Sequence, residues 1–165
     1  DHLWERGARR VGIVMPDISW SSLDTSRAAY DEWCAEKGSR PIIGEAKVRA
    51  CASVSAVVGA AAKATSSLLA RRSRPDALIG LFGYFGRGIV AAAQARGLEV
   101  PRDLMVAQDN DGFEAQVGAP PITALDLDMS GQFAEAVQLL IEGRSDTSEV
   151  RVLVPRLTVR ASTAG

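Results

Sequence analysis

The chain has 165 residues and 47% of them are hydrophobic, which excludes an intrinsically disordered protein and allows one domain with a sizeable core. Its net charge of −1 argues against DNA binding by this segment itself, because phosphate contacts need a basic surface. No apolar run approaches the roughly 20 residues that span a bilayer, and no charged-then-apolar leader opens the chain, so we expect no membrane contact and a cytoplasmic location.

In chain order, apolar runs alternate with segments of helical periodicity. The apolar runs predict strands at 10–15, 41–47, 77–82, 104–108 and 122–127, and short terminal strands at 150–154 and 157–160. The helical spacing predicts helices at about 23–37, 52–71, 87–95 and 130–142. This alternation is typical of an α/β protein, and we expect a doubly wound, mostly parallel sheet with helices on both faces. Because ligands bind at the carboxyl ends of such strands, the turns after Leu81 and Ala107 are the first places to look for function.

Three stretches, in a fixed order, resemble the effector-binding domain of LacI/GalR bacterial transcription regulators. They are HLWERGARRVGIV near the start, RPDALIG with the later VPRDLMVAQDND and APPIT, and VPRLTVRAST near the end. The resemblance implies a periplasmic-binding-protein-like type I fold, with a second lobe at about 9–127 and 155–163 and a first-lobe segment at 129–154. It also implies a helix-turn-helix domain and most of a first lobe upstream, so we interpret the chain as a fragment.

The resemblance implies an effector-sensing and dimerisation segment of a DNA-binding repressor. A small molecule, sugar-like or another metabolite, would bind in the cleft between two lobes and control DNA binding by the missing N-terminal domain. We expect a homodimer that reaches DNA only through that domain. Two alternatives are a solute-binding protein of a sugar transporter, which shares the two-lobe fold, and a dimerisation module that binds no ligand.

Catalytic and metal chemistry find little support in the residues. The only histidine, His2, lies far from any predicted strand end, so no Ser-His-Asp set can be assembled. The glycine-rich stretch GLFGYFGRG lacks the Lys-Ser/Thr ending of a phosphate-binding loop. Cys34 and Cys51 lie in predicted helices and are expected to be reduced thiols. We therefore expect no enzyme, no cofactor and no metal.

Seven residues are candidates for ligand binding, and the resemblance places six of them at or near positions that the family uses. Regulators of this family hold the effector with an Arg, an Asn-Asp pair, a Gly-aromatic-Asp-Asp turn and an aromatic residue. At these positions, or beside them, the chain has Ser26, Arg27, Phe82, Asp109 and Asn110. Arg49 lies near the position of the family's aromatic residue, and Trp20 lies in the loop before the first long helix.

These departures predict an unusual site. Phe82 and Asn110 replace an amide and a carboxylate, so we expect weak recognition of common hexoses. We expect Trp20, Phe82 and Asn110 to line one concavity, although Phe82 also fits a core residue and Asn110 also fits plain turn chemistry. Further along, an apolar stripe needs cover, from a second copy of the chain or by folding back onto the sheet. Its members are Phe133, Val137, Leu140 and Ile141.

Overall fold

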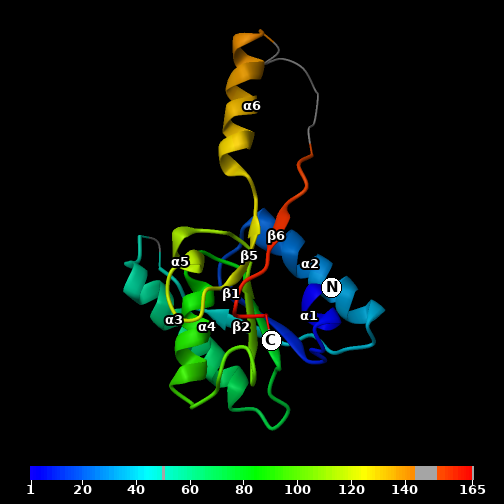
Figure 1. Ribbon diagram of the computed structural model, residues 1–165, viewed down its shortest axis with the longest axis vertical. Coiled ribbons are helices and arrows are strands. Elements are labelled where there is room, and N and C mark those ends of the chain that lie inside the picture. Colours follow the sequence, from blue (N-terminus) through cyan, green and yellow to red (C-terminus); the bar gives the residue numbers. More distant parts are fainter. Residues whose placement is uncertain (50, 144–151, 165) are drawn as a thin grey trace.

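One sheet with helices on both faces forms the centre of the protein, whose computed structural model describes residues 1–49, 51–143 and 152–164 (Figure 1). The strands are β1 (Val11–Pro16), β2 (Ile43–Ala46), β3 (Ala77–Gly80), β4 (Met105–Gln108), β5 (Thr123–Asp126) and β6 (Arg156–Thr158). The helices are α1 (His2–Glu5), α2 (Ser21–Glu36), α3 (Val54–Leu69), α4 (Phe85–Gln94), α5 (Phe113–Gln116) and α6 (Met129–Ile141). No helix in these described ranges is long and apolar enough to cross a membrane.

The strands lie in the order β2-β1-β3-β4-β5-β6, and every pairing is parallel except that of β6 with β5. Helices α3 and α4 cover one face of the sheet, and α1 and α2 lie on the other (Figure 1). The predicted doubly wound α/β fold is thus confirmed. Because the parallel strands point the same way, the turns after β1, β3 and β4 meet at one edge.

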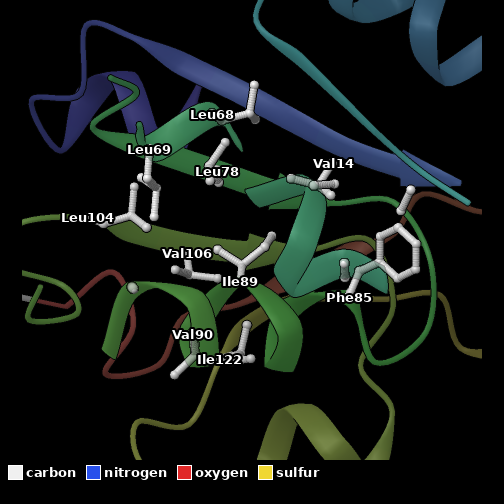
Figure 2. Packing of buried hydrophobic residues seen from close by; sticks show 14 of the residues in the cluster. Val14, Leu68, Leu69, Leu78, Phe85, Ile89, Val90, Leu104, Val106 and Ile122 are labelled. Carbon is white, nitrogen blue, oxygen red and sulfur yellow. The ribbon is translucent and has the colours of Figure 1, made fainter. Parts of the chain in front are cut away.

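The larger core lies between the sheet and α3 with α4 (Figure 2). Leu78 and Val106 of the central strands are fully buried against Leu68, Phe85 and Ile89 of the two helices. The helices approach each other closely at a glycine, since a Cβ atom on Gly88 would lie 2.5 Å from the Cβ atom of Ala61. This close approach sets the spacing between α3 and α4.

A smaller core lies under α2 on the opposite face. Leu23, Tyr30 and Cys34 pack there against Ile13 and Met15 of β1. The hydroxyl of Tyr30 donates to the carbonyl of Val11 at 2.8 Å and accepts from the backbone N–H of Ile42 at 2.9 Å. These bonds fasten α2 to β1 and to the segment that leads into β2.

Two sequence-based expectations differ from the structure. Residues 152–154 form no strand, and Val152 and Val154 are 81% and 84% exposed; 150 and 151 lie outside the described residues. The apolar run is typical of a strand, but no strand among the described residues pairs with it. The stripe on α6 does not fold back onto the sheet, because α6 projects away from it (Figure 1) and Phe133 and Leu140 are 65% and 63% exposed.

The close contact at Gly88 gives a prediction with a matched control. Gly88→Ala should destabilise the protein by roughly 1–3 kcal/mol, because the new methyl group would also lie 2.6 Å from the carbonyl oxygen of Val58. Gly59→Ala, on α3 with nothing within 4 Å, should stabilise by roughly 0.5–1 kcal/mol, because alanine favours the helix. Urea denaturation measures both, and equal midpoints for the two variants would contradict the packing described.

Candidate functional site

The turns after β1, β3 and β4 bring polar and aromatic side chains together at the carboxyl edge of the sheet. Trp20, at the start of α2, contacts Phe82 with ring centroids 5.8 Å apart, and Trp20 is 52% exposed. Phe82 also meets the buried Phe85 edge-to-face at 5.4 Å. Phe82 therefore links the core under α4 to an exposed aromatic surface, and it is only half-buried.

The turn after β4 is held by the buried side chain of Gln108. Its amide nitrogen donates to the backbone carbonyl of Asn110 at 2.7 Å and to the carboxylate of Glu114 at 3.0 Å. Glu114 in turn accepts a hydrogen bond from the backbone N–H of Tyr84 at 3.4 Å. Gln108 thus ties the turn after β4 to the turn after β3. The side chain of Asn110 itself is exposed.

The last residue of that turn is anchored by an ion pair. A terminal nitrogen of Arg160 lies 2.6 Å from a carboxylate oxygen of Asp111, and both side chains are mostly buried. Arg160 also donates to the carbonyl of Ile122 at 2.8 Å. The pair therefore connects the chain beyond β6 to the turn after β4 and to the start of β5. Removing one partner would leave the other charge buried and unpaired.

A groove of about 430 Å³ lies between the sheet and the helices α1 and α2, and its lining includes residues that follow β3 and β4. Ser26, Tyr30 and Trp33 of α2 form one wall, and its other lining residues include Leu81 and Asp109. Leu125 and Leu157 extend the floor along β5 and β6. The lining is mostly apolar, so the carboxylate of Asp109 stands out.

Asp109 lies in a setting that disfavours its charge. Burial raises the pKa of Asp109 to about 6, against the lowering effect of a hydrogen bond from its own backbone, and the nearby carboxylate of Glu114 adds to the rise. Its Oδ1 atom is buried and has no hydrogen-bond partner. The carboxylate of Asp109 thus has one oxygen that accepts no hydrogen bond from the described residues.

The predicted ligand-binding residues fall into three groups. Ser26 and Asp109 line the groove, while Trp20 and Phe82 contact each other beside the strand ends. Asn110 lies exposed in the turn next to Asp109. The expected single concavity of Trp20, Phe82 and Asn110 is not the groove, which none of the three lines. That these side chains bind a ligand stays a prediction.

The two candidate arginines lie elsewhere. Arg27 points to Glu45 of β2, with 3.2 Å between a guanidinium nitrogen and the carboxylate, and Arg49 is exposed beyond β2. Tyr30 and Leu125 line the groove but were not expected from the sequence. The helical spacing of Ser26 and Tyr30, one turn apart, is the signal that would have included Tyr30.

The described residues hold no group of three metal-ligating side chains. Cys34 is buried in α2 and is a free thiol, whereas Cys51, also a free thiol, is exposed in the turn before α3 and not in a helix as expected.

Comparison with known proteins gives a consistent match. The model of the periplasmic binding protein-like domain matches residues 1–163. The HTH-type transcriptional repressor PurR of Pasteurella multocida is 28% identical over 100 residues, which make up 59% of this chain and 30% of that protein. The lactose operon repressor of Rhizobium radiobacter is 36% identical over 78 residues, 46% of this chain and 67% of that protein.

A solved structure agrees with these relatives. A LacI family transcriptional regulator from Bifidobacterium animalis subsp. lactis has a TM-score of 0.83 at 28% identity, covering 99% of this chain and 58% of that one. The chain therefore spans less than a third of the Pasteurella repressor and little more than half of the Bifidobacterium regulator.

Because Asp109 is largely buried, we expect that replacing it raises the stability of the folded protein, and that the increase depends on pH. Because the raised pKa means that the folded state binds the proton more tightly, stability should fall as pH rises from about 4 to about 6. Asp109→Asn should remove this loss and stabilise the protein by roughly 1–3 kcal/mol at pH 7.5, but not below about pH 4. Urea denaturation across this range measures it. Asp31→Asn on the exposed face of α2 is the control, and a gain independent of pH would contradict the account.

Proposed function

Because the chain belongs to the family of periplasmic binding protein-like domains, and within it resembles the effector-binding domains of LacI/GalR regulators, we propose that it is the effector-sensing segment of a transcriptional repressor. The match over residues 1–163 carries the proposal. The protein binds a small metabolite at the carboxyl edge of the sheet, in the cleft between this lobe and a second one. It is not an enzyme, and it works in the cytoplasm.

The positions of two ion pairs support a mechanism by which a bound ligand changes the arrangement of the lobes. The chain leaves the sheet after β5 and returns at β6, and the excursion includes α6 (Figure 1). Asp126 and Arg156 form an ion pair at 3.1 Å where these two strands meet. The pair of Asp111 with Arg160 joins the ligand-binding turn to the chain just beyond β6. A ligand that shifts this turn therefore acts on the strands that connect the lobes.

DNA binding belongs to another part of the regulator. With a net charge of −1, these 165 residues are not basic enough to favour contacts with DNA phosphates. Effector binding would change the affinity for DNA by favouring one arrangement of the lobes over another.

A metabolite screen tests the proposed function. A thermal-shift screen of sugars, nucleosides and amines, followed by calorimetry, should find at least one ligand that stabilises the chain by mass action. A flat screen would favour the alternative of a dimerisation module that binds no ligand.

Within that screen, glucose and galactose should bind weakly. Loss of a charged hydrogen bond at the positions of Phe82 and Asn110 should cost roughly 1.5–3 kcal/mol, or about one to two decades in Kd. Calorimetry measures the affinity, with the tightest ligand of the screen as the positive control. Micromolar binding of either hexose would show that these two positions do not set specificity.

We also propose that the protein is a homodimer, and that in this 165-residue chain the stripe on α6 lies in the interface. No residue of α6 is buried, and Phe133, Val137, Leu140 and Ile141 are all exposed. Burying each of these side chains in an interface would stabilise the dimer by roughly 1.5–3 kcal/mol.

Light scattering coupled to size exclusion should show a dimer of the chain, and the double variant Phe133→Glu, Leu140→Glu should be monomeric. Gln132→Glu, exposed on the other side of the same helix, serves as the control and should remain dimeric. A monomeric chain with the native α6 would contradict the proposed interface.

A further inference from the structure

An aromatic surface at the carboxyl edge of the sheet suggests the chemical class of the effector, an inference that rests on the proposed function. Trp20, which follows β1, and Phe82, which follows β3, have ring centroids 5.8 Å apart and ring planes inclined at 49°. Strands β1 and β3 are adjacent and parallel, so the two rings meet at the edge where the proposed cleft lies. Because Trp20 is 52% exposed and Phe82 is half-buried, the pair presents ring surface to the solvent.

The fold holds this surface in place. Phe82 contacts the buried ring of Phe85 edge-to-face at 5.4 Å and packs against the larger core. Trp20 precedes the first turn of α2, where its backbone carbonyl accepts from the N–H groups of Leu23 and Asp24 at 2.9 and 3.0 Å. The ring of Phe82 and the backbone of Trp20 are therefore fixed before a ligand arrives, which lowers the entropic cost of binding.

The position of Phe82 suits a flat ring better than a sugar. The resemblance implies an amide at this position, whereas the ring of Phe82 offers no hydrogen bond to a hydroxyl group. An aromatic ring on the ligand can instead stack on it. There is also open space next to Phe82 in the chain, since a Cβ atom on Gly83 would have nothing within 4 Å apart from its chain neighbours.

We propose that the effector is a metabolite that carries a flat aromatic ring, and that this ring stacks on Trp20 and Phe82 at the carboxyl edge of the sheet. Stacked aromatic pairs are stabilised beyond what the burial of their area contributes. Trp20 and Phe82 are thus specificity-determining residues, because they distinguish a flat ring from a saturated ring of similar size.

Three glucosides that differ only in the group attached to the sugar test the ring preference. Methyl, phenyl and cyclohexyl β-D-glucopyranoside carry no attached ring, a flat aromatic ring and a puckered apolar ring. Dissociation constants are measured on the 165-residue chain by NMR titration. The phenyl glucoside should bind about 3- to 10-fold more tightly than the cyclohexyl glucoside, because only the flat ring stacks, and the methyl glucoside should bind most weakly. Equal affinities for the phenyl and cyclohexyl glucosides would overturn the proposal.

Three variants locate the preference. Trp20→Ala and Phe82→Leu should each remove most of it, and Phe82→Leu keeps an apolar side chain against Phe85 so that the fold is retained. Phe113→Ala is the control, because it removes another aromatic ring, 76% exposed on α5, and it should keep the preference for the phenyl glucoside. A preference that survives in both Trp20→Ala and Phe82→Leu, or that disappears in Phe113→Ala, would contradict the assignment.

The outcomes also separate this inference from the proposed function. If the metabolite screen finds a ligand without an aromatic ring that binds Trp20→Ala as tightly as the native chain, the effector function stands and the aromatic class is wrong. If neither the metabolite screen nor the three glucosides give binding, both fall.

Discussion

Parallel pairing of the first five strands is the constraint on which the rest of the structure depends. A parallel pair cannot be joined by a tight turn, so each connection crosses the sheet through a helix and the strands all point the same way. The turns after β1, β3 and β4 therefore meet at one edge, to which they contribute Trp20, Phe82 and Asp109. Residues separated by 89 positions in the chain thus contribute to one surface.

Burial then gives the residues at this edge their different roles. The carboxylate of Asp111 is neutralised by Arg160 and holds the end of the chain to the sheet. The carboxylate of Asp109, two residues earlier, has no such partner: its Oδ1 atom is buried without a hydrogen bond, and its pKa is raised to about 6. One acidic turn therefore contains two carboxylates in opposite settings, one paired with an arginine and one buried without a charged partner.

Much of the sheet could be predicted from the sequence, because strands buried on both faces are nearly continuous apolar runs. The runs at 77–82 and 104–108 contain the observed β3 and β4. The short helices α1 and α5 have four residues each, too few to show a period of 3.6. The prediction of a strand at 150–154 was wrong at 152–154. A strand also needs a neighbouring strand with which to pair, and the local sequence does not show whether one is present.

The candidate site was predicted in part. The resemblance pointed to Ser26 and Asp109, and both line the groove. It could not show that Arg27 pairs with Glu45 or that Tyr30 and Leu125 form walls of the same groove, because these contacts join elements far apart in the chain. The unpaired oxygen of Asp109 is likewise a property of the folded surroundings.

Mapping of a bound ligand by NMR tests the central claim most directly. In a titration of the isotope-labelled chain with the tightest ligand found, the largest amide shifts should fall at Ser26, Phe82 and Asp109, around the carboxyl edge of the sheet. Shifts confined to the outer surface of α3 and α4, on the opposite face, would contradict an effector site at this edge.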